Sequence, residues 1–245
     1  MDKKYLKFLY SKSVALVGPA EYLTNLKLGE KIDSYDIVVR VNRGMELIDK
    51  YPDSLGRRTD IVYNCLIESL DNGGIVDIGE YKNRGVNWIS TIPGSLPTGE
   101  CNSSKLHKMV NPKKVKKIKE NLNFHVMDYK EYGKLNKEVE CRSNTGFSAI
   151  FDLLNYKVSK LYVCGFSFYL DNFISGYKDG CARNEEVFAE QCFKSKRHNQ
   201  KNQWNRMKNL YKNEKRLKCD HILDYILNME ELSRDDFKKA NLYSD

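Results

Sequence analysis

The chain has 245 residues, of which 41% are hydrophobic and 30% are charged, and its formal net charge is +8. This length and apolar content predict one domain of moderate size with a core, and the composition argues against a disordered chain. The modest positive charge favours anionic partners, such as nucleotide phosphates, acidic glycans, nucleic acid or an anionic membrane surface, without choosing among them.

Residues 1–12 are a basic lead-in, which we expect to be a frayed helix or coil. They contain no apolar run of the length that a signal peptide or membrane anchor needs, and the fold is expected to begin directly after them. The seven cysteines are an odd number without a C-x-x-C pair, which favours a reducing compartment over a disulfide scaffold or a zinc site. We therefore expect a natively soluble, cytoplasmic protein.

Three short apolar runs follow the lead-in, over Ser13–Val17, 36–41 and 60–64. The first stops at a Gly-Pro pair, the second at Asn-Arg-Gly and the third at a polar residue, as buried strands that feed tight turns do. Strands of an open α/β sheet present their carboxyl ends at one edge, where ligands bind. The sequence therefore predicts a binding edge that gathers the residues after these strands.

The remaining chain continues in an alternating α/β pattern. Further strands are predicted over 86–90, 123–127 and 160–164, and helices over 105–121 and from 147. Residues 65–79 are predicted to begin as a short helix, 91–104 to form a loop at the active-site wall, and 129–140 to be a charged connection. There is no repeat and no low-complexity linker, so we predict a single α/β domain over residues 1–245.

A run of five lysines marks the helix predicted over 105–121. A solvated helix face is the favoured interpretation of such a run. The alternative is contact with an acidic acceptor or, peripherally, with a membrane surface through Lys113 to Lys119.

A polar cluster, Ser143 to Gly146, precedes an apolar helical pattern that begins at Phe147. Such residues cap the free N–H groups at the start of a helix. The same N–H groups and the helix dipole also make an anion site. A plain N-cap and a phosphate site both remain open on this feature alone.

Two combinations of motifs resemble one known family. LVGPAEYL, LGEKIDSYDIVVRVNRG and LGRRTDI, in this order, resemble the large sialyl motif of the eukaryotic-type sialyltransferases of glycosyltransferase family 29, and SNTG followed by LYVCGF resembles their small motif. The resemblance implies a Rossmann-like three-layer fold (a GT-A-like variant) with a mostly parallel sheet. It also implies inverting, metal-independent transfer from a CMP-sugar donor to a glycan or glycolipid acceptor, without a cofactor.

The resemblance assigns roles to individual residues. It implies His198 as the catalytic base, with Gln203 where the family has Glu, and Tyr177 as the substitute for a phosphate-binding His. Residues 171–197 would form a lid, and Val14 and Val158 would replace a disulfide. The donor-binding residues that we expect are Gly18, Pro19, Asn42, Asn144, Thr145, Gly146, Gly165, Phe166 and Tyr177.

Other functions remain open at this stage. The donor could be CMP-sialic acid or CMP-Kdo, and the fold could be a binding module for a nucleotide or glycan without turnover. A nucleic-acid-binding protein is suggested by charge alone and has no recognition motif. A dinucleotide-dependent oxidoreductase is disfavoured because the turn at Gly18 lacks G-x-G-x-x-G. No D-x-D motif or metal-ligand spacing is present in the sequence, so no metal is expected.

Overall fold

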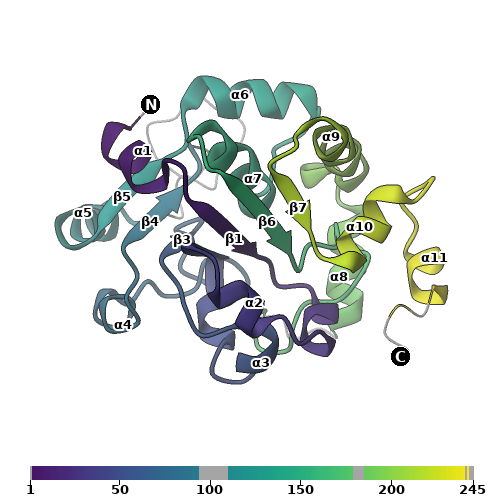
Figure 1. Ribbon diagram of the computed structural model, residues 1–245, viewed down its shortest axis with the longest axis horizontal. Helices are drawn as coiled ribbons and strands as arrows, with labels where there is room; N and C mark the ends of the chain where they lie inside the picture. Colours follow the sequence, from purple (N-terminus) through teal and green to yellow (C-terminus); the bar gives the residue numbers. More distant parts are fainter. Residues whose placement is uncertain (1, 94–109, 179–184, 241, 243–245) are drawn as a thin grey trace.

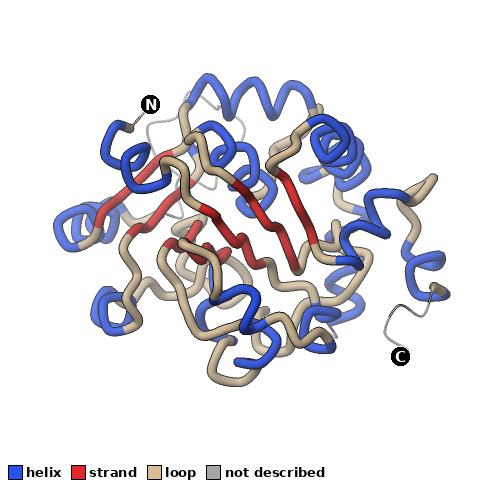
Figure 2. Tube along the Cα trace, in the orientation of Figure 1, coloured by secondary structure: helices blue, strands red, loops and turns tan. Residues whose placement is uncertain are grey.

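The computed structural model describes residues 2–93, 110–178, 185–240 and 242 (Figure 1). Seven parallel strands in the order β5-β4-β3-β2-β1-β6-β7 form one sheet with helices on both of its faces (Figure 2). The strands are β1 (Ser13–Val17), β2 (Ile37–Val41), β3 (Ile61–Tyr63), β4 (Trp88–Thr91), β5 (Asn123–Val126), β6 (Lys160–Cys164) and β7 (Leu217–Cys219).

The helices connect the strands in an alternating α/β order. They are α1 (Lys3–Leu9), α2 (Gly29–Asp33), α3 (Pro52–Leu55), α4 (Ile78–Asn83), α5 (Pro112–Asn121), α6 (Tyr129–Glu138), α7 (Thr145–Asn155), α8 (Glu185–Lys194), α9 (Gln200–Asn213), α10 (His221–Asn228) and α11 (Arg234–Lys239). Short 3₁₀ helices lie at η1 (Glu21–Asn25), η2 (Asn42–Leu47) and η5 (Lys196–His198). Among the described residues, no helix is both long and apolar enough to cross a membrane.

Helix α7 is fixed to one face of the sheet by a buried carboxylate. Asp152 accepts hydrogen bonds from Tyr63 Oη at 2.7 Å and from His125 Nε2 at 2.9 Å, and all three residues are buried. Tyr5 of α1 joins this cluster, with its hydroxyl 3.2 Å from that of Tyr63 and its ring stacked on His125. A buried carboxylate with two donors specifies one position of a helix, so α7 has a defined register above β3 and β5.

The opposite face of the sheet holds a buried cation. The Arg40 guanidinium donates to the carbonyl oxygens of Leu55 and Arg58 and to Thr59 Oγ1, at 2.7 to 3.2 Å. Arg40 is therefore a structural residue of the strand, and its partners are two carbonyl groups and a hydroxyl group. Arg58 lies before β3 and binds Asp60 and the carbonyl of Tyr35, at the amino edge of the sheet, away from the expected binding edge.

The sheet reverses its winding between β1 and β6. The chain leaves β1 toward β2 on one side, and it leaves β6 toward β7 on the other, which opens a crevice at the carboxyl ends of these two neighbouring strands. Gly18 and Gly165 lie there back to back. A Cβ on Gly18 would approach Gly165 O to 2.3 Å, and Gly165 has a φ of +73°. Only glycine allows the two strand ends to approach so closely.

Most of the predicted elements are confirmed. All six predicted strands are present within two residues of their expected bounds, and the α/β Rossmann-like fold is observed with a sheet that is parallel throughout its seven strands. Val14 and Val158 are both buried in the core. Leu9 of the lead-in is buried, and the lead-in forms a helix, α1, as one of the two predicted forms, but this helix is capped by Asp2 and is not frayed.

The predictions for two segments are wrong. Residues 65–77 form turns instead of a helix because the Asn64 side chain binds the Gly73 carbonyl and the Leu66 N–H and folds the loop on itself. Residues 129–138 form helix α6 instead of a connection, capped by the Asp128 carboxylate. Helix α5 begins at Pro112, and the predicted loop over 94–104 lies outside the described residues, as do residues 105–109 of the predicted helix.

Candidate functional site

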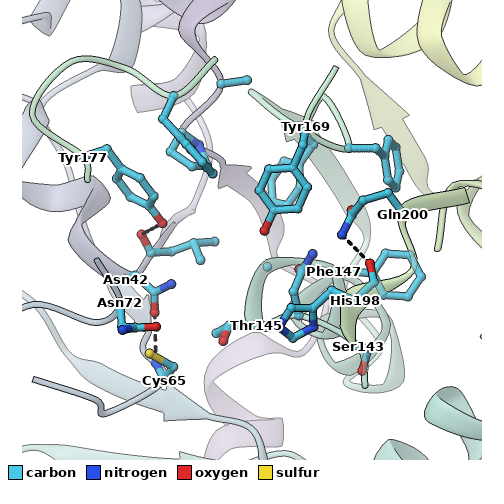
Figure 3. A pocket seen from close by; sticks show the side chains of 18 of the residues that line it. Asn42, Cys65, Asn72, Ser143, Thr145, Phe147, Tyr169, Tyr177, His198 and Gln200 are labelled. Carbon is cyan, nitrogen blue, oxygen red and sulfur yellow. Dashed lines mark hydrogen bonds between the residues drawn. The ribbon is translucent and has the colours of Figure 1, made fainter. Parts of the chain in front are cut away.

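A pocket lies in the crevice at the carboxyl edge of the sheet. Its lining comes from the segments after β1, β2, β3, β4 and β6, from the start of α7 and from the segment around η5. Asn42, Cys65 and Tyr177 line one side, and Thr145, His198 and Gln200 line the other (Figure 3). Among the described residues that line the pocket, none is an aspartate or a glutamate.

The start of α7 supplies backbone donors to this pocket. The Asn144 side chain caps the helix by accepting from Phe147 N at 2.8 Å. This bond leaves the N–H groups of Thr145 and Gly146, both in the pocket lining, as the donors of the first turn. Backbone N–H groups and the positive end of a helix dipole bind phosphate oxygens well, so this end of the pocket suits an anionic group.

The second residue of α7 must be small. A Cβ on Gly146 would approach the Phe166 ring to 2.9 Å and Val41 to 3.4 Å. The start of α7 therefore packs directly on Phe166, in the segment that follows β6. This close contact brings the helix terminus into the pocket.

His198 faces the same region with a defined tautomer. Its Nδ1 lies 2.6 Å from the carbonyl oxygen of Arg142. Because a carbonyl can only accept, Nδ1 carries the proton and donates, and Nε2 keeps its lone pair for a ligand. Burial, helped by the cations of Arg142, Arg197 and Lys178, lowers the pKa of His198 to about 4 against the opposing effect of the Arg142 carbonyl. The imidazole is thus neutral at pH 7, the form that a general base needs.

Three cations near His198 were missed by the sequence analysis. Arg142, Lys178 and Arg197 all line the pocket. Lys178 also donates to the carbonyl of Asp71 and lies over the rings of Phe173 and Tyr177. Arg142 and Arg197 adjoin motif residues in the sequence, and this proximity was the available signal for them. The cations make the pocket attractive to a multiply charged anion.

Asn42 and Tyr177 occupy the opposite side. Asn42 has a φ of 48°, and its side-chain oxygen accepts from Cys65 N at 2.9 Å, which ties the end of β2 to the end of β3. The Tyr177 hydroxyl is directed at the Val41 carbonyl, 3.4 Å away, and the ring is buried. Tyr177 therefore forms a wall of the pocket, and its predicted phosphate contact stays a prediction.

The roof of the pocket is aromatic. Phe168, Tyr169 and Phe173 line it, with Tyr169 and Phe173 edge to face at 5.4 Å between ring centroids. Phe168 and Tyr169 are consecutive residues with φ values of 51° and 61°. Such a conformation costs non-glycine residues about 1–2 kcal/mol each. Two adjacent cases at a binding pocket indicate that the surrounding contacts hold this turn in place.

Comparison with known proteins identifies relatives of this chain. The model of glycosyltransferase family 29 (sialyltransferase) matches residues 7–126. Type 2 lactosamine alpha-2,3-sialyltransferases of Homo sapiens and Pongo abelii are each 32% identical over 85 residues, which are 32% of this chain and 25% of theirs. This chain is related to the family 29 sialyltransferases. It spans about a quarter of the length of the curated relatives it matches.

Solved sialyltransferases share the fold. A mammalian sialyltransferase in complex with Gal-beta-1-3GalNAc-ortho-nitrophenol superposes with a TM-score of 0.52 at 15% identity, covering 88% of this chain and 71% of that chain. The sialyltransferase CstII from Campylobacter jejuni, in complex with CMP-3FNeuAc, gives a TM-score of 0.54 at 15% identity, covering 91% and 87%. At these identities the likeness shows a common Rossmann-like, GT-A-like fold.

The predicted donor-binding residues and His198 converge on one pocket, with Gly18 as the exception. The lining includes Pro19, Asn42, Asn144, Thr145, Gly146, Gly165, Phe166, Tyr177 and His198. Gly18 lies just behind the lining, where it spaces the two strand ends. Gln203 does not touch the His198 ring and instead binds the His198 carbonyl.

The predicted lid over 171–197 begins as a fixed wall. Asn172 O accepts from Glu21 N and Pro19 O accepts from Ile174 N, both at 2.9 Å, so this segment is bonded to the turn after β1. Residues 179–184 lie outside the described residues, and α8 follows them. The described residues 171–178 therefore belong to the wall of the pocket, and the predicted lid stays a prediction.

Proposed function

We propose that this chain is a glycosyltransferase that moves sialic acid or a related ulosonic sugar from a CMP donor to a hydroxyl group of a glycan. The observation that carries the proposal is the pairing, in one pocket, of the free N–H groups that start α7 with a neutral histidine whose Nε2 is available. The N–H groups can stabilise the charge on the leaving phosphate, and the imidazole can accept the proton of the acceptor hydroxyl.

The reaction follows from these two positions. The acceptor oxygen attacks the anomeric carbon while its proton moves to His198 Nε2. The bond between that carbon and the phosphate oxygen breaks, and CMP leaves with the electron pair. The N–H groups of Thr145 and Gly146 stabilise the charge on the phosphate, and the surrounding cations add to this field.

Direct displacement with inversion is part of the proposal. A double displacement needs a nucleophilic side chain, usually a carboxylate, near the anomeric carbon. The described lining residues contain no carboxylate, which supports a single step with His198 as the base. We propose that the reaction needs no metal ion, because one phosphate can be stabilised by backbone N–H groups and cationic side chains.

The first test is thermal unfolding of the chain with CMP, UMP, GMP and NAD at equal millimolar concentrations. A ligand at about 100 times its dissociation constant adds about 2.7 kcal/mol to stability. We expect CMP to raise Tm most. Transfer from CMP-sugars, assayed with EDTA present, should then persist in the wild type and fall at least about 100-fold in His198→Asn.

The controls separate the parts of this proposal. His198→Asn should keep the CMP-dependent rise in Tm, because the imidazole is assigned to the acceptor rather than the nucleotide. No response to CMP, or a response only to NAD, would contradict the proposed donor. Full activity of His198→Asn would contradict the assigned base, and binding of CMP without any transfer would support a binding module instead.

A further inference from the structure

Gln203 lies in the first turn of α9, fully buried beneath His198. Its Nε2 donates to the His198 carbonyl oxygen at 2.8 Å, and its Oε1 accepts from Asn144 N at 3.3 Å. One side chain thus joins the backbone of the proposed base to the backbone of the residue that caps α7. These are the two segments that the proposed reaction must hold in register.

The chemistry of the two partners fixes which group residue 203 can carry. A backbone N–H can only donate, so the atom facing Asn144 must be an acceptor; a carbonyl can only accept, so the atom facing His198 O must be a donor. A neutral amide offers one of each. An ionised carboxylate offers two acceptors, and one of them would face the lone pairs of the His198 carbonyl.

The His198 carbonyl is held from two sides. Gln200 also donates its Nε2 to this oxygen, as the dashed line in Figure 3 shows. His198 is then fixed at three points, because its Nδ1 donates to the Arg142 carbonyl. Losing the Gln203 bond would leave the carbonyl partly unsatisfied in a buried setting and release the segment toward the pocket.

We propose that Gln203 is the positioning residue of the site: its amide sets the distance between the proposed base and the phosphate-binding start of α7, and this chain requires Gln rather than Glu at that position. This inference rests on the proposed function. The simpler view, in which Gln203 is a weakened form of the Glu found in the family, has the opposite consequence, because restoring Glu would then raise activity.

The test compares Gln203→Glu and Gln203→Met with wild type and with Asn213→Asp, which adds the same charge to an exposed position of α9. We expect Gln203→Glu to lower kcat for transfer from a CMP-sugar at least about tenfold at pH 7.5, while the dissociation constant for CMP changes less than about threefold. Asn213→Asp should match the wild type. Gln203→Met should lie near Gln203→Glu.

The pH dependence gives a readout that a purely structural role would not move. In Gln203→Glu, the protonated carboxyl group can donate to the His198 carbonyl, so the activity of this variant relative to wild type should recover as pH falls from 8 to 5. Equal or higher kcat in Gln203→Glu at pH 7.5 would overturn the inference, and so would a constant ratio across pH. Failure of the proposed function is distinguishable, because wild type would then show no CMP binding or transfer.

Discussion

At the scale of single residues, the neighbours of His198 determine its tautomer and its protonation state. A carbonyl at Nδ1 selects one tautomer, and burial with nearby cations keeps the ring neutral. The His198 ring is therefore neutral at physiological pH, and its basicity is low in the absence of anions. A bound phosphate would offset part of the positive field.

We predict that ¹⁵N NMR of the histidine rings shows the Nδ1–H form of His198 throughout pH 6–8. Addition of CMP should raise the pKa of this ring, because the phosphate charge favours the imidazolium. The signal is assigned by its absence in His198→Asn. A pKa that stays unchanged on saturation with CMP would place the phosphate away from His198.

Some residues of the site could be predicted from the sequence, because their conformation depends on residues close to them in the chain. The start of α7 and the glycines after β1 and β6 are set by neighbours in the sequence, so Asn144, Gly146 and Gly165 were found. The approach of Lys178 to His198 depends on how the segment after β6 turns back toward β1, and no short pattern encodes that turn. Gln200 was missed although its partner, the His198 carbonyl, is two residues away, because no motif includes this glutamine.

At the scale of elements, the two glycines that follow β1 and β6 set the width of the crevice. Gly18 and Gly165 meet through backbone atoms, which cannot move aside as a flexible side chain can. The packing of β1 against β6 and the opening of the pocket therefore depend on the same contact. A methyl group there would separate the strands.

We predict that Gly18→Ala lowers the free energy of unfolding by at least about 2 kcal/mol, because the new Cβ would lie 2.3 Å from Gly165 O. Gly133→Ala is the matched control. A Cβ at Gly133, inside α6, would meet no atom within 4 Å, so this change should stabilise the protein by about 0.5–1 kcal/mol.

Urea unfolding followed by circular dichroism measures both changes. Similar midpoints for Gly18→Ala and wild type would show that the strand ends can separate without cost. Destabilisation by Gly133→Ala would show that the surroundings of α6 are tighter than described. The first result would change the account of the crevice, and the second would remove Gly133→Ala as a control.

Strands and helices were predicted correctly where the sequence has a clear apolar pattern, and they were missed where charged residues interrupt that pattern. The apolar strands from β1 to β6 were recognisable, but α6 carries Gly133 and several charges and was taken for a connection. No element was predicted for residues 214–245, yet β7 and α10 lie there. β7 has three residues and one exposed lysine, too short for alternation to mark it.

The lysine run of α5 is another element-scale outcome. Lys114 pairs with Glu68, Lys116 pairs with Glu120, and Lys119 lies over the Phe124 ring. Val115 and Ile118 are buried against the body, so α5 is amphipathic with its charged residues on the outer face. The solvated-face interpretation accounts for these contacts, and a peripheral membrane contact through Lys113 to Lys119 remains a proposal.

At the scale of the whole molecule, two partly buried ionisable groups near the crevice have opposite effects on stability. Burial lowers the pKa of His198 to about 4 and raises that of Asp171 to about 6. Between pH 6.5 and 4 the unfolded chain binds more protons than the native His198 does, so this group lowers stability as pH falls. Asp171 has the opposite sign, because its native form binds protons first.

We predict that these two contributions nearly cancel in wild type between pH 6.5 and 4, each being roughly 3 kcal/mol at most. His198→Asn should lose the destabilising slope, so its stability relative to wild type should rise as pH falls. Asp171→Asn should show a relative fall over the same range. Denaturant unfolding at several pH values measures the differences, and parallel curves for all three proteins would contradict the buried states of both groups.

The sheet has two edges, and both are short. β5 has four residues and β7 has three, with the Lys218 side chain exposed in the middle of β7. Sheets recruit foreign strands through long, flat, uncharged edges, which act as templates for intermolecular pairing. With few unpaired backbone groups and a lysine on one edge, this sheet is a poor template for intermolecular strand pairing. The parallel architecture therefore gathers binding groups at one edge without making the open sheet prone to aggregation.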